Sequence, residues 1–335
     1  CFMTFIAKVF DPKKLVQDYG DAEAEARACR KSSAVFDFSF MSVARISGVQ
    51  VSEFFAKLTD RNLIDFERGH IRYALSRDSN GWLKSDLTIW KDAVDSFLVM
   101  SGLGRDLLDL ADDFEIKDEK VVVFSVQGPK TLFALSHLTN IKLLKTLPYF
   151  GFTQQDVAGI NCYVGRLGYT GELGFEIIVP SKYGDQLWMS LSNNIRPAGF
   201  IAANCLRIEA GFVLFSNEFR LPVTAEEAGL KAFSRNDPIL PRYRLVSFCA
   251  ENSWAQKKYF SEIYDIVPPK SGFISVTSVC HSELANGILG LGYVLKNEAI
   301  VGRCFIDPTG LYKNIRMVNI PFYDTHKLRP RVSLD

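Results

Sequence analysis

The fold of this 335-residue chain is decided by residues 168–176, which are Gly168-Tyr169-Thr170-Gly171-Glu172-Leu173-Gly174-Phe175-Glu176. Three glycines within seven positions tolerate positive φ and close approach to the backbone, so this glycine-rich turn predicts a shaped loop. The flanking residues 161–165 and 175–180 have the β-branched and aromatic composition of two hairpin strands. Because side chains on a strand alternate, Phe175 and Ile177 share one face and Glu176 lies on the other.

Glu176 is therefore an acid on a largely apolar strand. A carboxylate is seldom buried without a partner. Two alternatives follow for Glu176: it pairs with a cation inside the protein, or it meets a ligand that is rich in N–H donors.

Composition limits the classes of protein that fit. With 47% hydrophobic residues the chain can build two or three units with real cores. Its 39 basic and 38 acidic residues leave a net charge of +1, which argues against a nucleic-acid partner. The seven scattered cysteines indicate a reducing compartment and no metal site. The apolar opening, residues 1–7, is too short for a membrane span, so we expect a cytoplasmic protein without a membrane partner.

A second predicted hairpin joins residues 71–76 to residues 83–90 through an Asp-Ser-Asn-Gly turn. If the two middle residues of that turn are its centre, Tyr73 lies directly opposite Asp86. Asp86, Thr88 and Trp90 then share one face of the second strand. An acid, a hydroxyl and an indole on one face fit a cleft wall, although a solvated sheet face would carry the same residue types.

The fold class predicted from the whole pattern is α+β. Residues 14–31, 182–194 and 198–210 have helical spacing, and Gly211 suits a C-terminal helix cap. From residue 235 onward the chain has short strands and prolines, which predicts a separate all-β domain.

Four separated stretches together resemble the glycine-cleavage T-protein family, the folate-dependent aminomethyltransferases. They are residues 30–39, residues 73–90 with Ser85-Asp86-Leu87, the glycine-rich turn at 168–176, and residues 206–230. Their order along the chain is the order of the family. The resemblance extends to the demethylating folate domains of dimethylglycine and sarcosine dehydrogenases.

The resemblance implies a three-domain cloverleaf with tetrahydrofolate in a central channel. It implies a discontinuous α+β domain of residues 1–45 and 118–234, an α+β domain of residues 46–117, and a C-terminal β-barrel domain of residues 235–335.

The family's site residues fall on five positions of this chain. Asp86 matches the catalytic aspartate and Glu176 the pterin-binding glutamate. Tyr73, Tyr169 and Trp90 match residues that contact the folate. A carboxylate can accept both the ring N–H and the amino group of a pterin, and aromatic rings suit stacking on it.

Two positions depart from the family pattern. Phe40 stands where the T-protein usually has a histidine, and Ala203 where it has a folate-contacting arginine. Arg207 and Glu209 lie near the end of a predicted helix, where anchoring that end is the expected role.

The sequence predicts an enzyme that moves a methyl or aminomethyl-type one-carbon unit from a small donor to tetrahydrofolate. A lipoyl carrier or a dehydrogenase is a candidate partner. The alternatives are a non-catalytic folate-binding or partner-binding protein on the same scaffold, and a relative that no longer binds folate. Methylated amines, sulfonium compounds, aryl methyl ethers and an aminomethyl-lipoyl group all stay open as donors.

Overall fold

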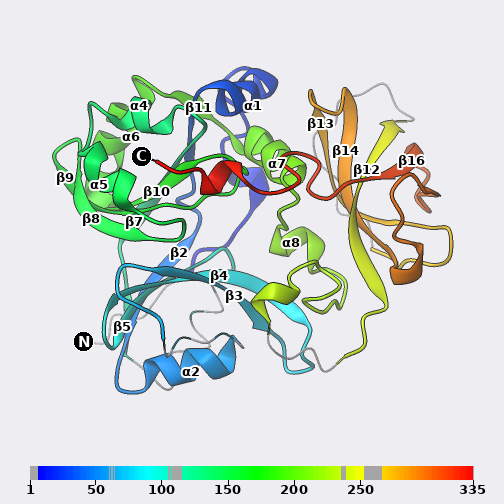
Figure 1. Cartoon of the computed structure of the whole chain (residues 1–335), viewed down its shortest axis with the longest axis horizontal. Helices are drawn as coiled ribbons and strands as arrows, with labels where there is room; N and C mark the ends of the chain where they lie inside the picture. Colours follow the sequence, from blue (N-terminus) through cyan, green and yellow to red (C-terminus); the bar gives the residue numbers. More distant parts are fainter. Residues whose placement is uncertain are drawn as a thin grey trace.

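The computed structural model describes residues 7–59, 61, 63, 65–104, 107, 115–234, 239–252 and 266–334. Residues 1–6 of the apolar opening and residue 235, where the third domain is predicted to begin, lie outside the described residues. Three β-sheets surround the middle of the molecule, and helix α7 (Phe200–Glu209) lies between the first and the third (Figure 1).

The first sheet has six strands in the order β11-β1-β7-β10-β9-β8. They are β1 (Ala34–Asp37), β7 (Val121–Gln127), β8 (Phe152–Val157), β9 (Ile160–Gly165), β10 (Gly174–Pro180) and β11 (Arg196–Ala198). The predicted hairpin across the glycine-rich turn is confirmed, since β9 and β10 pair antiparallel with Glu176 opposite Gly165. The alternation is confirmed too, because Phe175 and Ile177 pack in one core and Ile178 packs in the other.

Helices cover this sheet and connect its strands. They are α1 (Ala22–Lys31), α4 (Thr131–Leu135), α5 (Ile141–Thr146), α6 (Gly184–Ser192) and α7. Helix α1 begins where the Asp21 carboxylate accepts the Ala24 N–H, a side-chain cap that satisfies one of the free donors of the first turn. Helix α7 ends as predicted: Gly211 follows it with φ +68°, and its N–H donates to the Ile208 carbonyl.

The second sheet has five strands in the order β3-β4-β5-β2-β6. They are β2 (Ser42–Ser47), β3 (Ile71–Arg77), β4 (Leu83–Ala93), β5 (Ser96–Ser101) and β6 (Glu115–Asp118), and helix α2 (Val51–Leu58) packs below them (Figure 1). On β4, Leu87 and Ile89 face one core while Trp90 faces another, as the alternation predicts.

The predicted register of the β3–β4 hairpin is wrong by two residues. Tyr73 pairs with Thr88, and Leu75 pairs with Asp86. The reason lies at the turn, where the Asp78 N–H donates to the Trp82 carbonyl and the ladder then shifts between Ser76 and Arg77. The loop and the shift each move the pairing by one residue, and together they move it by two. Because side chains alternate with a period of two, every side chain keeps the face that was predicted for it.

The third sheet has five strands in the order β13-β14-β12-β16-β15. They are β12 (Tyr243–Asn252), β13 (Ser275–Ser282), β14 (Gly287–Leu295), β15 (Cys304–Phe305) and β16 (Tyr312–Val318). The predicted closed barrel is not confirmed, because β13 and β15 remain edge strands within the described residues. A single bridge between Phe273 and Ile306 joins the segments beside those edges. One bridge does not supply the continuous ladder that closure needs.

Each sheet takes its strands from one of the three predicted domain ranges, with two exceptions in the second sheet. Strand β2 crosses the boundary set between residues 45 and 46, and β6 reaches one residue past the boundary set between residues 117 and 118. The division into domains stays a prediction. Among the described residues, none of the helices combines the length and apolar character needed to span a bilayer.

Candidate functional site

A cavity of about 630 Å³ lies where the three sheets meet. Tyr73 and Asp86 line it from the second sheet, Tyr169 and Glu176 from the first, and Leu245 from the third. Four side chains that the sequence singled out are thus brought to one hollow from segments about a hundred residues apart. A concave site of this size, mostly apolar with a few polar groups, suits a small-molecule ligand.

Asp86 lies on the cavity side of β4. The Tyr73 hydroxyl donates a hydrogen bond of 2.9 Å to Asp86 Oδ2, along the diagonal of the hairpin. Burial, and then the nearby Asp86 charge, raise the pKa of Tyr73 well above its usual value. Tyr73 therefore stays a donor at neutral pH and fixes the orientation of the carboxylate.

Glu176 faces the same cavity from β10 and is only 5% exposed. Its Oε2 atom is buried and has no hydrogen-bond partner among the described residues. Burial raises the pKa of Glu176 from 4.5 to about 7. Of the two alternatives that the sequence left open, the internal cation is not found in the described part of the chain. Glu176 Oε2 therefore keeps the capacity to accept a hydrogen bond from a ligand in the cavity.

The raised pKa makes a prediction about stability. Between about pH 4.5 and pH 7 the folded chain keeps a proton on Glu176 that the unfolded chain has lost, so stability falls as pH rises through this window. The shift corresponds to about 3 kcal/mol. The free energy of unfolding of Glu176→Gln, measured in urea as a difference from wild type, should therefore rise by about 3 kcal/mol from about pH 4 to about pH 8. An equal difference at both pH values would show that Glu176 ionises normally.

The glycine-rich turn is fixed by the side chain of Gln127. Gln127 Nε2 donates to the Leu167 carbonyl over 3.1 Å, and the Thr170 hydroxyl donates to Gln127 Oε1 over 2.9 Å. Gly168 and Gly174 pack against this amide so closely that a Cβ on either would overlap it. The turn thereby holds Tyr169, whose hydroxyl donates to the Val213 carbonyl over 2.5 Å.

Gly174→Ala should destabilise the chain by about 1–3 kcal/mol, because Gln127 and the turn cannot both keep their places around an added methyl group. A suitable control is Gly184→Ala, at the start of α6, where φ is −56° and the new Cβ would meet Val122 at 3.1 Å. The control should change stability by less than about 1 kcal/mol. Thermal unfolding measures both variants, and equal effects would contradict the role given to Gln127.

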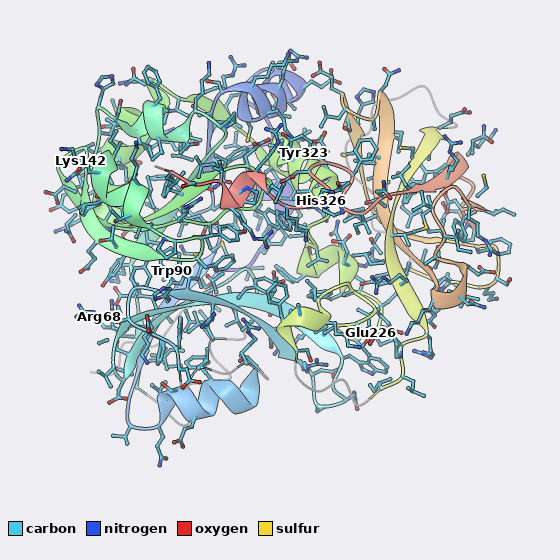
Figure 2. All side chains as sticks on the ribbon, in the orientation of Figure 1. Arg68, Trp90, Lys142, Glu226, Tyr323 and His326 are labelled. Carbon is cyan, nitrogen blue, oxygen red and sulfur yellow. The ribbon has the colours of Figure 1, made fainter. Side chains whose placement is uncertain are left out.

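Trp90 does not lie in this cavity, contrary to the expectation that it lines the folate channel. Its side chain is fully buried at the junction of two sheets, with its ring 5.2 Å from that of Phe152 and close against Gly165 (Figure 2). Its Nε1 donates to Thr88 Oγ1 over 3.0 Å, and Thr88 does line the cavity. Trp90 thus supports the wall from behind.

Sequence reasoning missed the contribution of the C-terminal segment. Lys327 and Arg331 line the cavity, and burial followed by the nearby Arg331 charge lowers the pKa of Lys327. Tyr149 and Phe212 also line it, the latter with its ring stacked 6.0 Å from that of Tyr169. The four stretches that carry the family resemblance end at residue 230, so they gave no signal for these two cations.

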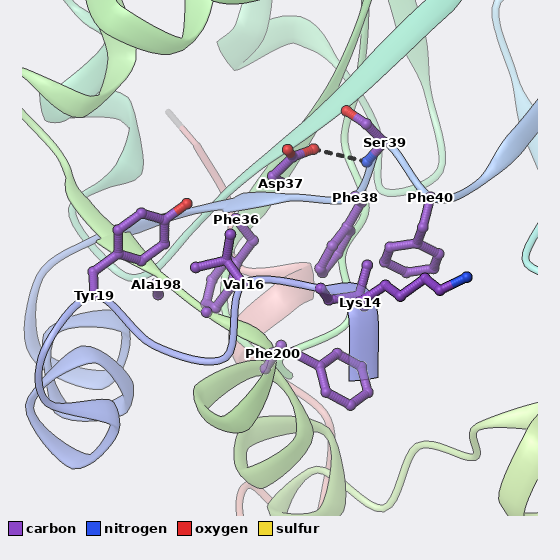
Figure 3. A pocket seen from close by; sticks show the side chains of 13 residues that line it. Lys14, Val16, Tyr19, Phe36, Asp37, Phe38, Ser39, Phe40, Ala198 and Phe200 are labelled. Carbon is purple, nitrogen blue, oxygen red and sulfur yellow. Dashed lines mark hydrogen bonds between the residues drawn. The ribbon is translucent and has the colours of Figure 1, made fainter. Parts of the chain in front are cut away.

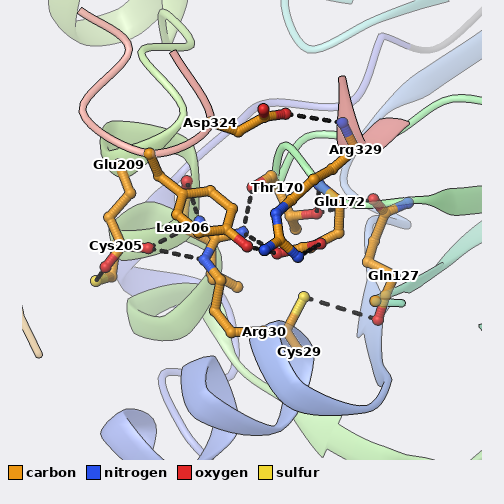
Figure 4. A network of polar contacts seen from close by, with 12 residues as sticks. Cys29, Arg30, Gln127, Thr170, Glu172, Cys205, Leu206, Glu209, Asp324 and Arg329 are labelled. Carbon is orange, nitrogen blue, oxygen red and sulfur yellow. Dashed lines mark hydrogen bonds and ion pairs between the residues drawn. The ribbon is translucent and has the colours of Figure 1, made fainter. Parts of the chain in front are cut away.

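A buried ion network holds the glycine-rich turn from the outside (Figure 4). Arg30 of α1 bonds Glu209 of α7 at 2.7 Å and Glu172 of the turn at 3.0 Å, and it also donates to the Thr170 carbonyl at 2.8 Å. The ring of Tyr323 lies 3.9 Å from the guanidinium, and its hydroxyl donates to Glu172. Arg30 therefore ties three segments, distant in sequence, around the turn.

Arg207 forms a second buried cluster and has the anchoring role predicted for it. It is fully buried, bonds Glu218 at 2.8 Å, and donates to Asn204 Oδ1, to Ser278 Oγ and to the Phe212 carbonyl. These bonds fix the end of α7 to β13. Glu209 has the same role, since it binds Arg30 and accepts from Ser282 at 2.6 Å.

Comparison with known proteins gives a consistent result. The family model of the GCVT N-terminal domain matches residues 6–237. An aminomethyltransferase of Thermosipho melanesiensis is 31% identical over 326 residues, which cover 91% of this chain and 90% of that protein. One from Saccharopolyspora erythraea is 31% identical over 334 residues, with the same two shares. One from Thermoanaerobacter pseudethanolicus is 30% identical over 229 residues, or 64% of this chain and 62% of its own length.

The fold is also similar to a solved structure. The glycine cleavage system aminomethyltransferase T from Bartonella henselae superposes with a TM-score of 0.74 at 20% identity, covering 93% of this chain and 92% of that one. At that identity the likeness bears on the fold alone.

Proposed function

This chain belongs to the glycine-cleavage T-protein family and is a transferase of the aminomethyltransferase type, and we propose that tetrahydrofolate binds in the central cavity and accepts a one-carbon unit there. Glu176 and Tyr169 would hold the pterin, and Asp86 would act at the reacting nitrogen with Tyr73 beside it. A partner that delivers the donor, such as a lipoyl carrier or a dehydrogenase, stays a prediction.

The observation that carries this proposal is the buried Oε2 atom of Glu176, which has no hydrogen-bond partner among the described residues. A pterin presents a ring N–H and an amino group side by side, and one carboxylate can accept both. Binding would supply the missing partner of Oε2 and would favour the ionised form of a group whose pKa burial has raised to about 7. A ligand without adjacent donors would leave that cost in place.

Asp86 supports transfer rather than storage of the folate. It can orient the folate nitrogen nucleophile or accept its proton, and its negative charge stabilises a cationic one-carbon fragment. A module that only binds folate has no need of an acid oriented by Tyr73 at 2.9 Å in the same cavity. The non-catalytic alternative is therefore not favoured.

The test is a titration followed by turnover. The purified chain is titrated with tetrahydrofolate by calorimetry and then incubated with a panel of one-carbon donors. We expect saturable binding and either 5-methyl- or 5,10-methylene-tetrahydrofolate as product. Binding without product from any donor would favour the non-catalytic module, and failure to bind would contradict the proposal itself.

A further inference from the structure

Thr88 brings a hydrogen-bond donor to the wall of the central cavity. Its Oγ1 atom accepts the Trp90 Nε1–H over 3.0 Å, and because an indole nitrogen only donates, the Thr88 proton points elsewhere. Within the described part of the chain that proton has no acceptor. Thr88 is half-buried and lines the cavity, so its hydroxyl can donate to a ligand there.

Thr88 lies between the two acids that the proposed function uses. Asp86, Thr88 and Trp90 follow one another on the same face of β4. The ring of Trp90 lies so close to Gly165 that a Cβ there would overlap it, and Gly165 pairs directly with Glu176 across β9 and β10. The row that begins at Asp86 therefore runs toward Glu176, and Thr88 is its middle member.

The described side chains beside Thr88 supply no competing donor. Met100 is its partner on β5 and lines the cavity next to it. Phe38 and Phe40 pack in the same core cluster as Met100, and both also line the smaller hollow that Figure 3 shows. Tyr73, its partner on β3, already donates its hydroxyl proton to the neighbouring carboxylate. A ligand acceptor at this part of the wall would therefore depend on Thr88.

A reduced pterin has one acceptor that fits this position. Around its ring, the amino group and N3–H, which Glu176 would bind, are followed by the C4 carbonyl and then by N5, where Asp86 would act. The carbonyl oxygen thus lies between the atoms assigned to the two acids, as Thr88 lies between the acids themselves. Alternate residues of a strand are about 7 Å apart, so Thr88 meets a different ligand atom from the one that Asp86 meets.

We propose that Thr88 is a ligand-binding residue whose hydroxyl donates a hydrogen bond to the C4 carbonyl of the pterin. The inference rests on the proposed function and specifies the pterin that the site accepts. A pterin with an amino group at C4 would set a donor against the Thr88 hydroxyl and leave its proton without an acceptor. Sites that pair a polar group discriminate strongly against analogues that leave it unpaired, so a 4-oxo pterin is favoured.

The test measures tetrahydrofolate binding to the full chain by calorimetry. Thr88→Val removes the hydroxyl at nearly constant volume and should weaken binding about tenfold, because the buried carbonyl loses its partner. Thr88→Ser keeps the donor, so it should recover most of the affinity. Thr153→Val makes the same change on strand β8, outside the residues that line the cavity, and should bind as wild type does.

A structural role of Thr88 has to be separated from this contact, since Thr88→Val also leaves the buried Trp90 N–H without its acceptor. The readout is the stretching frequency of the C4 carbonyl in bound, isotope-labelled tetrahydrofolate, measured by difference infrared spectroscopy. The band should lie at higher frequency in Thr88→Val than in wild type and Thr88→Ser, because a lost hydrogen bond strengthens the C=O bond. Loss of the Trp90 contact alone would lower stability and leave the band in place.

Thr88→Cys is the second variant, for the case that Thr88→Val does not fold. Its thiol still offers a weak acceptor to the Trp90 N–H but is a poor donor, so the affinity and the carbonyl band should change in the same direction. An unmoved band, or wild-type affinity, in the folded variant would overturn the inference. Failure of wild type to bind tetrahydrofolate would instead overturn the proposed function on which it rests.

Discussion

Asp86→Asn should lower the rate of one-carbon transfer by about 10²–10⁴-fold while tetrahydrofolate still binds, because the amide keeps the shape of the carboxyl group but neither accepts a proton nor carries a charge. Tyr73 can still donate to the amide oxygen, so the wall of the cavity should be kept. The measurement is single-turnover formation of the methylated or methylene folate, beside a calorimetric titration.

Asp95→Asn is the matched control, since it makes the same chemical change in the exposed turn that follows β4. It should leave turnover unchanged. Tyr73→Phe removes the hydroxyl that orients Asp86 and should give a smaller loss, with a changed pH profile of kcat/KM. Wild-type turnover in Asp86→Asn would remove this residue from the mechanism.

Arg30→Met should destabilise the chain by about 3–5 kcal/mol, the range found when one partner of a buried ion pair is removed. The Arg30 side chain is 9% exposed, and those of Glu172 and Glu209 are 1% and 4% exposed. Methionine keeps much of the packing volume but leaves both carboxylates without their main cation. Because Glu172 belongs to the glycine-rich turn, affinity for tetrahydrofolate should fall as well. Urea unfolding and a titration measure the two effects.

Arg27→Met, one turn earlier on α1, is the control for this change. Arg27 bonds Glu283 at 2.8 Å, but the two side chains are 41% and 56% exposed. An exposed pair contributes about 0–1 kcal/mol, so the control should unfold close to wild type. A loss in Arg30→Met no larger than in Arg27→Met would mean that the buried network is not what holds the turn.

Local patterns were enough to predict much of this molecule. The strand period placed Glu176 on the face of β10 opposite to Phe175 and Ile177, and the glycines marked the turn before that strand. The same period put Asp86 and Thr88 on one face of β4, and both line the cavity. These features depend on side chains a few residues apart, where alternation and turn chemistry decide the outcome.

Long-range features were not accessible in this way. The offset of the β3–β4 hairpin came from the loop that Asp78 closes and from a shift at Ser76, which residue types alone do not specify. Trp90 shares the predicted face but lies far enough along β4 to meet Phe152 instead of the cavity. The bonds of Arg30 to Glu172 and Glu209 span more than 140 residues, and no local pattern signals such a partner.

The most direct measurement of the central claim is the affinity for tetrahydrofolate as a function of pH, in wild type and in Glu176→Gln. Because the pKa of Glu176 is raised to about 7, wild type should bind about tenfold more weakly at about pH 6 than at about pH 8. Glu176→Gln should bind at least about thirtyfold more weakly than wild type at the higher pH, with little change between the two pH values. Equal affinity of the two proteins at the higher pH would contradict the claim that this carboxylate receives the pterin.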